Sequence, residues 1–444
     1  MSARQGVQDR VLFISRYFPP DGEVGGRRIA RFCQELPKLG IDPIVLTFPK
    51  PVSPTEPEVE GVSVFRVGPW PHPLHMWAKL KSRVGVSGNH SSPLAAEAAD
   101  PVSFGIKDHL GMALQVPDIV NSWYPPAVRA ASKLISEKSP GTVITTGPPW
   151  TCHLIGKALK RRFGVKWIAD FRDPWTAEVM RSYLPPWRQN LGKRLERGCL
   201  VAADGVVCTT QQIRSFFYES YPELPREKFH VVPNGFEPTP RPSHVVKDSR
   251  RLLLHVGNLY GTRRIDTFCE AVQRLISAGQ FDPQTTRIIF LGDSEEELIQ
   301  PARDKTPDIF EKKVVEFSPK VGWSLAQSTL WGADVHLIFQ GRHTMQIPAK
   351  FFECLQTGAP ILAVAEPGAL TTIVEETGSG LCADSRDVNA IAEQLRRLLS
   401  TVPSPNGNTH RSFEEYQWAS VTQKLGNVID ALRHNSISAG KVRG

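Results

Sequence analysis

Short apolar segments recur along the chain, and most are followed by a loop and by a stretch in which apolar residues have helical spacing. The first apolar segment covers residues 11–14, an amphipathic stretch follows at 27–39, and the next apolar segment covers 44–46. Apolar runs without alternation are typical of strands that are buried on both faces of a parallel sheet. The pattern therefore predicts a βαβ unit with a right-handed crossover at the start of the chain.

The same pattern divides the chain into two halves. The further predicted strands are 142–145, 167–170, 205–208 and 230–232 in the first half, and 251–257, 287–291, 314–317, 335–339 and 361–364 in the second. The proline-rich segment 237–243 between them has the composition of a linker. We therefore expect an α/β protein with two Rossmann-like parallel-sheet domains, residues 1–240 and 241–410. The remaining segment, 411–444, is expected to hold a last helix at 413–432 and a loose tail.

Composition and charge limit the class of protein. The chain has 444 residues, of which 41% are hydrophobic and 22% charged, as in soluble globular proteins. It lacks an apolar run long enough to span a membrane and enters its first strand without a signal-peptide core. The seven cysteines are scattered, without a C-x-x-C pair, which favours reduced thiols in the cytoplasm. The net charge of +8 permits an anionic partner, but no nucleic-acid motif accompanies it.

Residues 345–380 carry the strongest functional signal. Lys350 and Glu353 lie on one predicted helical segment, and the apolar strand 361–364 is followed by a turn at Gly368 that opens a helix. The free backbone N–H groups and the dipole of such a helix N-terminus favour phosphate. A cation and a carboxylate beside it would suit a diphosphate and the hydroxyl groups of a ribose. The pattern predicts a nucleotide site; the alternative is an ordinary surface lysine and carboxylate.

A second candidate phosphate site follows the predicted strand at 251–257. The loop and helix start after it carry Asn258, Arg263 and Arg264. The planar guanidinium group of arginine can bind two phosphate oxygens at once. Arg263 is the stronger of the two arginine candidates, and the alternative for the whole segment is a solvated helix start.

The segment 345–380 resembles the nucleotide-sugar site of family-4 retaining glycosyltransferases, which have the GT-B fold. The motif P-x-K-x-x-E of a subset of that family is matched at Lys350 and Glu353, and Gly368 matches its phosphate-binding turn. Met345 stands where most members have a first glutamate. The resemblance implies that the second half binds the sugar donor, that the first half binds the acceptor, and that the last helix returns to the first domain.

The resemblance also implies roles for individual residues. It assigns catalytic roles to Arg263, Lys350 and His153, donor contacts to Glu353, Gly368, Ala369, Leu370, Asn258, Phe317, Gly25 and Gly26, and acceptor-side roles to Asp170, Arg172, Asp173 and Trp175. Enzymes of this fold generally work without a metal, so neither a metal nor a cofactor is expected. Structural alternatives stay open in the first half. His153 could be a core or capping histidine, Asp170 could belong to an Asp–Arg pair that fixes a loop, and Gly25 and Gly26 could simply end a loop at a helix cap.

The implied activity is transfer of a sugar, with retention of configuration, from a nucleoside-diphosphate sugar to a hydroxyl group. We expect a glycan, glycolipid or lipid-linked acceptor and a role in surface polysaccharide or glycolipid synthesis. Two alternatives remain open: a nucleotide-sugar 2-epimerase of the same fold, and a non-catalytic subunit that binds sugar nucleotides. The methionine at position 345 makes the second alternative credible.

Two predicted helices of the first half, 153–163 and 187–197, carry basic residues beside apolar stripes. Together with Trp70, Met76 and Trp77 they would dock the first domain on an anionic membrane surface. Solvated helix faces are the alternative for each helix alone. This pattern predicts a cytoplasmic protein that associates peripherally with the inner face of a membrane.

Overall fold

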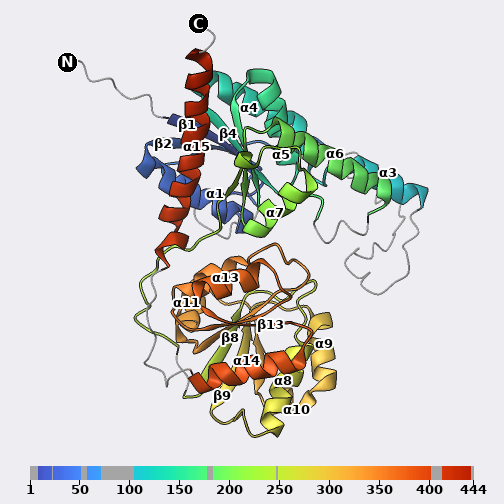
Figure 1. Ribbon diagram of the computed structural model, residues 1–444, viewed down its shortest axis with the longest axis vertical. Coiled ribbons are helices and arrows are strands. Elements are labelled where there is room, and N and C mark those ends of the chain that lie inside the picture. The colour runs from blue at the N-terminus through green and yellow to red at the C-terminus, as the bar shows by residue number, and fades with distance from the viewer. Residues whose placement is uncertain are drawn as a thin grey trace, which may run out of the picture. The chain divides into compact units, whose positions relative to one another are not determined.

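The computed structural model describes residues 9–22, 24–51, 58–71, 105–177, 184–246, 249–401 and 413–441. The chain forms two compact units, each with its own sheet (Figure 1). The first unit contains Met1–Pro233 and Trp418–Gly444, and the second contains Asn234–Gln417. The chain thus leaves the first unit once and returns to it for its last helix.

A seven-stranded parallel sheet forms the centre of the first unit, in the order β3-β2-β1-β4-β5-β6-β7. Its strands are β1 (Asp9–Ile14), β2 (Ile41–Thr47), β3 (Ser63–Arg66), β4 (Thr142–Gly147), β5 (Lys166–Phe171), β6 (Gly205–Cys208) and β7 (Phe229–Val231). Every residue of β4 and β6 is buried. Helices cover both faces of the sheet, which explains why the central strands are apolar without alternation.

The helices of the first unit are α1 (Val24–Glu35), α3 (Ile106–Leu114), α4 (Tyr124–Lys138), α5 (Thr151–Phe163), α6 (Pro186–Ala202), α7 (Gln211–Ser220) and α15 (Trp418–Lys441). Short 3-10 turns lie at Leu36–Leu39, Asn121–Trp123 and Arg226–Lys228. Helices α1 and α15 lie side by side (Figure 1) and share one core cluster, which includes Ile29, Phe32, Leu425 and Ile429. Because proline cannot continue an α-helix, α1 gives way to a 3-10 turn at Pro37.

The second unit has a six-stranded parallel sheet in the order β10-β9-β8-β11-β12-β13. Its strands are β8 (Arg251–Val256), β9 (Thr286–Leu291), β10 (Val315–Ser318), β11 (Val335–Phe339), β12 (Ile361–Val364) and β13 (Gly380–Ala383). Its helices are α8 (Asp266–Ser277), α9 (Glu296–Lys305), α10 (Pro307–Glu311), α11 (Trp323–Gly332), α12 (Ala349–Leu355), α13 (Ala369–Thr377) and α14 (Val388–Thr401), with a 3-10 turn at Glu414–Tyr416. In both sheets the chain order reverses beside the first strand, as in doubly wound Rossmann-like folds.

The predicted fold class is confirmed, and most predicted strands lie within a residue or two of the observed ones. The last helix differs from its prediction. It begins at Trp418, after a 3-10 turn, and continues to Lys441, where a loose tail was expected. The residues that follow Leu432 include no proline, and Gly440 is their first glycine before the helix ends, so nothing in this segment stops the helix early.

Candidate active site

Three loops of the second unit meet at the carboxyl edge of its sheet. The loop after β8 and the loop after β11 are joined where the N–H of Arg342 donates to Thr262 Oγ1 at 3.0 Å. The loop after β11 also reaches the start of α13, because Ala369 N–H donates to the carbonyl of Thr344 at 2.6 Å. The carboxyl edge of a parallel sheet is where ligands of such folds bind. These contacts bring the candidate residues of 257–264 and 345–370 into one region.

Lys350 is held beside the first strand of this sheet by a histidine. Its Nζ lies 2.9 Å from Nε2 of His255, which is fully buried on β8. The other ring nitrogen of His255 lies 2.9 Å from the carbonyl of Leu337, to which it donates. That bond leaves Nε2 as the acceptor for Lys350. A Cβ added to Gly257 would lie 3.4 Å from Lys350 Nζ, so the amine faces the loop after β8.

Arg263 lies on the same loop. Its guanidinium group stacks 4.1 Å from the ring centre of Tyr260, and its Nη1 donates to the carbonyl of Asn258 at 3.2 Å. The side-chain oxygen of Asn258 accepts from the N–H of Asp293 at 3.2 Å and so ties the loops after β8 and β9 together. Arg264, in contrast, pairs with Asp266 at 2.8 Å. Only Arg263 of the two arginines therefore keeps a guanidinium group without an acidic partner in the described structure.

Burial and like charge act together on Lys350. Burial, and after it the charge of Arg263, together lower the pKa of the Lys350 amine to about 7. Burial and the nearby Lys350 also hold the pKa of His255 well below its ordinary value, so that the ring is neutral. Two basic groups thus share a site in which neither forms an ion pair with a described residue. A bound anion would relieve this repulsion.

Glu353 lies one helical turn from Lys350 on the short helix α12. Its side chain is half-buried, and its charge raises the pKa of Lys350, against the dominant effect of burial. Its neighbours Phe351 and Phe352 are buried and anchor the helix in the core. The anchored helix therefore presents an amine and a carboxylate at the same edge of the sheet.

The start of α13 forms the predicted turn, but its unbonded N–H groups lie after Ala369 and not at Gly368. Gly368 must be glycine, since a Cβ there would lie 2.2 Å from the Thr344 carbonyl. The N–H groups of Gly368 and Ala369 are occupied by Thr371 Oγ1 and by that carbonyl. Among the described residues, no acceptor faces the N–H groups of Leu370 and Thr371. Those two groups are the ones available to an anion at this helix end.

Phe317 lies at the edge of the sheet, on β10. Its ring stacks 4.9 Å from Phe290 and 6.3 Å from Phe310, with interplanar angles of 16° and 9°. The side chain is half-buried as part of the core of the second unit. It therefore contributes to packing, and only its partly exposed edge is open to a ligand.

In the first unit, Asp170 is a partner of a buried arginine. Its two carboxylate oxygens accept from Arg28 at 3.0 and 3.2 Å, and both side chains are almost completely buried. Arg28 also donates to the carbonyls of Val232 and Pro233, while Thr146 donates to Asp170 at 2.8 Å. The sequence left a loop-fixing Asp–Arg pair open, and such a pair exists, but its arginine comes from α1 and not from position 172.

His153 and Trp175 lie in the core of the first unit, each with no exposed surface. One ring nitrogen of His153 lies 2.8 Å from Thr145 Oγ1, and its ring centre is 4.2 Å from that of Phe171. Burial lowers the pKa of His153 to about 3. Trp175 stacks on Trp150 at 5.4 Å with an interplanar angle of 5°. Neither side chain reaches a surface of this unit, so the structure favours the core histidine among the two alternatives.

Arg172 and the two glycines of α1 lie together. The Nε of Arg172 donates to the carbonyl of Gly147 at 3.3 Å, and its Nη2 donates to the carbonyl of Pro148. A Cβ on Gly25 would overlap Arg172 Nη1, so only glycine leaves room for this guanidinium group. Gly26 packs against the backbone of Phe18 in the same way. Asp173 follows, half-buried, at the same end of the sheet.

Two residues that complete these clusters were missed by sequence reasoning. His255 and Arg28 are polar residues inside apolar patterns, on a buried strand and on the buried face of a helix. A polar residue at a position where the pattern is apolar was the feature of the sequence that could have indicated them. Over the described part of the chain, no group of three or more histidine, cysteine or acidic residues is placed to hold a metal ion.

Comparison with protein families gives the class of the molecule. Residues 25–235 match a family described as a glycosyl transferase 4-like domain, and residues 250–401 match the family of glycosyl transferases group 1. The two matches follow one another and together cover most of the chain. The protein therefore belongs to the glycosyltransferases that combine these two domains, and it is a transferase. No curated protein sequence matches the chain.

Solved structures show the same architecture. A sucrose-phosphate synthase from Thermosynechococcus elongatus is 15% identical, with a TM-score of 0.62 over 96% of this chain and 100% of its own. Anabaena HepE in complex with UDP is 14% identical, with a TM-score of 0.54 over 98% and 100%. The catalytic domain of starch synthase IV from Arabidopsis thaliana, bound to ADP and acarbose, is 12% identical, with a TM-score of 0.58 over 97% and 99%. At these identities the likeness concerns the fold, which is the expected GT-B fold.

Proposed function

We propose that this glycosyltransferase moves a sugar from a nucleoside-diphosphate sugar to a hydroxyl group with retention of configuration, and that the donor binds at the carboxyl edge of the second sheet. One observation carries the proposal. Lys350 and Arg263 converge there without an acidic ion-pair partner among the described residues. A diphosphate would neutralise both groups and would accept from the free N–H groups at the start of α13.

The remaining donor contacts follow from chemistry. Glu353 accepts from the two ribose hydroxyls, since a carboxylate can only accept and both hydroxyls can donate. Asn258, on the loop after β8, and Phe317, on strand β10, would flank the nucleotide. The neighbours solved with UDP and with ADP support a nucleotide donor, without fixing which base this chain takes. The family subset with the P-x-K-x-x-E motif is the one we assign.

Catalysis would depend on stabilising the negative charge of the leaving diphosphate. As the bond between sugar and diphosphate breaks, negative charge grows on the diphosphate, and groups placed to meet that charge lower the barrier. We assign this role to Lys350, Arg263 and the N–H groups of Leu370 and Thr371, which the approach of Lys350 to Gly257 and the free N–H groups support. These cations would take the part that a metal plays elsewhere, so a chelator should leave turnover unchanged. His153 has no part in this proposal because it is buried in the core.

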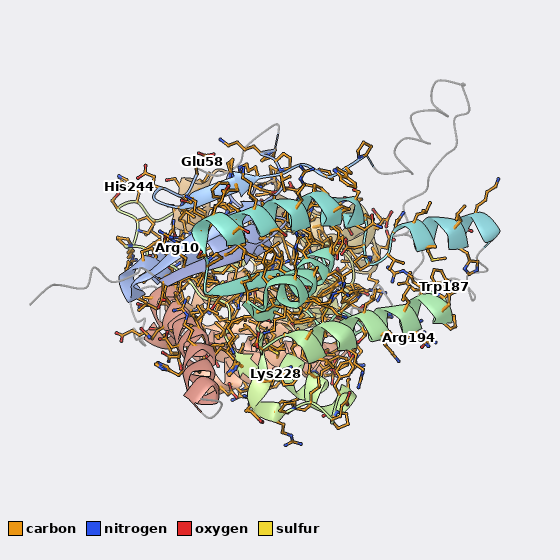
Figure 2. All side chains as sticks on the ribbon, turned by 90° about the horizontal axis from the view of Figure 1, so that it is seen from above. Arg10, Glu58, Trp187, Arg194, Lys228 and His244 are labelled. Carbon is orange, nitrogen blue, oxygen red and sulfur yellow. The ribbon has the colours of Figure 1, made fainter. Side chains whose placement is uncertain are left out.

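The first unit would bind the acceptor and carry the protein to a membrane surface. Exposed apolar side chains gather around α3 and α6: Leu110 and Trp187 are 62% and 38% exposed, and Trp187 Nε1 donates to His109 at 2.9 Å. Figure 2 shows Trp187 and Arg194 along α6, which runs beside α3. Lys193 and Arg194 are exposed on the same helix. This combination suits an anionic bilayer and a glycolipid or lipid-linked acceptor.

That surface would hold the protein at the inner membrane face without crossing it. Within the described ranges, no helix is both long and apolar enough to span a bilayer. Trp70 adds a further exposed ring at 57%. Met76 and Trp77, which the sequence also suggested for this surface, lie outside the described residues.

The test is a screen of nucleotide sugars by thermal shift, followed by a turnover assay with the best ligand. A ligand at about 100 times its dissociation constant adds about 2.7 kcal/mol to stability, which a melting curve resolves. Release of nucleoside diphosphate with transfer of the sugar supports the proposal. Formation of a 2-epimer of the sugar would instead support an epimerase, and tight binding without turnover would support a non-catalytic subunit.

A further inference from the structure

The loop between β11 and α12, residues 340–348, is folded around the side chain of its first residue. Gln340 is buried, with 6% of its surface exposed. Its Nε2 donates to the carbonyl of Gln346 at 2.8 Å and to the carbonyl of His343. Both partners can only accept, so the nitrogen of the amide group must be the atom that faces them. The Gln340 side chain therefore closes the loop from inside.

On one side, this loop contacts the segment that carries Arg263. The N–H of Arg342 donates to Thr262 Oγ1 at 3.0 Å. A Cβ on Gly341 would overlap the same hydroxyl oxygen, so the two backbones approach closely. Thr262 directly precedes Arg263 in the chain. A shift of the loop would therefore disturb the backbone next to Arg263.

On its other side, the loop contacts the start of α13. The carbonyl of Thr344 accepts from the N–H of Ala369 at 2.6 Å, and a Cβ on Gly368 would overlap that carbonyl. Because Thr344 occupies the N–H of Ala369, the N–H groups of Leu370 and Thr371 are the first that an anion could use. The position of Thr344 therefore decides where this helix end offers hydrogen bonds.

Helix α12, which follows the loop, has anchors of its own. Phe351 and Phe352 are fully buried in the core, and Lys350 has a hydrogen bond of 2.9 Å with His255. Glu353 follows these anchored residues directly. Loosening the loop should therefore disturb the groups proposed for the diphosphate and leave the carboxylate proposed for the ribose in place.

We propose that Gln340 is a positioning residue for the diphosphate of the donor. The inference deepens the proposed function and rests on it. By holding the loop closed, Gln340 fixes its contact with Thr262 beside Arg263 and its contact with Ala369 at the start of α13. Groups that bind a ligand need a supporting shell that holds them within about 0.5 Å of the productive geometry. Gln340 supplies this support from inside the loop, without contact with the donor.

The experiment compares a nucleoside diphosphate with its nucleoside. Calorimetry, with competition for weak ligands, measures binding of UDP and uridine to the full chain, and ADP with adenosine and GDP with guanosine are measured in the same way. Gln340→Met keeps the length of the side chain and loses both N–H donors. The dissociation constant of the diphosphate should rise at least about tenfold, as for a lost hydrogen bond to a charged group. That of the nucleoside should stay unchanged.

Two further variants separate positioning from general damage to the core. Gln327→Met is the matched control, because Gln327 is a glutamine of α11 with 8% exposure and no side-chain hydrogen bond to residues 340–348 in the described structure. It should bind both ligands as the unmodified protein does. Thr262→Val removes the hydroxyl that accepts from Arg342 and should weaken diphosphate binding selectively, by a smaller factor than Gln340→Met.

Two results would overturn the inference. One is the same diphosphate affinity in Gln340→Met and in the unmodified protein, and the other is an equal loss for diphosphate and nucleoside, which indicates general damage. If the melting curve shows that Gln340→Met is unfolded, unchanged diphosphate affinity in Thr262→Val overturns the inference instead. Failure of the proposed function looks different, because the unmodified protein would then bind none of UDP, ADP and GDP, and the inference would fall with it.

Discussion

In each unit a basic side chain lies in the interior beside a strand, but the two side chains have different partners. Arg28 of the first unit meets the carboxylate of Asp170 and two backbone carbonyls, so that its charge and its hydrogen bonds are satisfied. Among the described residues, Lys350 of the second unit has a hydrogen bond with the neutral ring of His255 but no ion pair, and another cation lies nearby. The first arrangement is complete without a ligand. We expect a bound anion to complete the second.

The difference shows how a strand-end charge can be assigned a role. A buried ion pair with all its donors used holds elements together, and removing one partner leaves an uncompensated charge. A buried amine held by a neutral acceptor keeps a position without losing its affinity for anions. Both groups lie near the carboxyl edge of a sheet. The partner of each basic group therefore indicates whether its role is structural or ligand-binding.

The largest effect is expected when the complete pair is broken. Asp170→Asn leaves Arg28 buried without a counter-charge and should cost about 3–5 kcal/mol of the free energy of unfolding. Urea unfolding followed by tryptophan fluorescence measures it. Asp42→Asn is the matched control, because the Asp42–Arg10 pair is exposed and should cost less than about 1 kcal/mol. Equal losses in the two variants would contradict a structural role for Asp170.

The incomplete site should respond in turnover. Lys350→Met and Arg263→Ala should each lower kcat by about 10²–10³-fold, the usual loss for one group that meets transition-state charge. Lys350→Arg should restore part of the activity because the two cations differ in shape. Lys312→Met, on an exposed lysine of the same unit, is the control. A change confined to KM would argue against a leaving-group role.

Glu353→Ala should weaken binding of the nucleoside diphosphate by about 1–3 kcal/mol, the range for hydrogen bonds to a charged group. Melting of the unliganded protein should barely change, since the carboxylate is only half-buried. Calorimetry with UDP, ADP and GDP measures the loss. Glu393→Ala removes an exposed carboxylate on α14 and should leave the affinity as it was. Unaltered affinity in Glu353→Ala would refute the ribose assignment.

The pKa of Lys350 predicts a pH dependence. Because its pKa in the folded, unliganded protein is about 7, nucleotide affinity should fall as the pH rises from about 7 to about 9, and Lys350→Met should remove this slope. The unfolded chain keeps this amine protonated up to its ordinary pKa of 10.5. It therefore binds more protons than the folded chain between these values, and stability relative to Lys350→Met should rise with pH there. A flat affinity profile would show that the amine does not meet the diphosphate.

The smallest effect per residue concerns the surface of the first unit. Each basic residue near an anionic membrane contributes about 1 kcal/mol, so Lys193→Glu combined with Arg194→Glu should reduce flotation with anionic liposomes. Binding of the unmodified protein should be lost at high salt, since the Debye length falls from about 10 Å at 0.1 M to about 3 Å at 1 M. Lys312→Glu in the second unit is the control. Equal flotation at both salt concentrations would exclude electrostatic docking.

The sequence predicted the central strands and the edge strands β7 and β10, but missed the edge strands β3 and β13. β3 reads Ser-Val-Phe-Arg with alternating exposure, and β13 is a short Gly-Leu-Cys-Ala segment, so neither has the apolar run that marks a central strand. Both depend on a neighbouring strand to exist, which a local pattern cannot show.

The site shows the same limit. Lys350, Arg263 and the turn at Gly368 could be placed together from the sequence, because strands of a parallel sheet end at a common edge. Their partners could not, since His255 is 95 residues from Lys350 and Arg28 is 142 residues from Asp170. These pairs form because elements that are distant in the sequence pack against each other in the fold. For that reason the sequence suggested Asp170 as an acceptor-side residue, while the structure gives it a buried arginine.

The second unit is, in topological terms, an insertion. The chain enters it at Asn234 and leaves it at Gln417, and the N–H of Phe236 donates to the carbonyl of Tyr416 at 2.9 Å. Entry and exit are thus fastened side by side, and removing residues 234–417 would require only a short linker to close the first unit. The second unit can therefore be exchanged as a single segment with two junctions at one place, while the first sheet and its last helix keep their own chain ends.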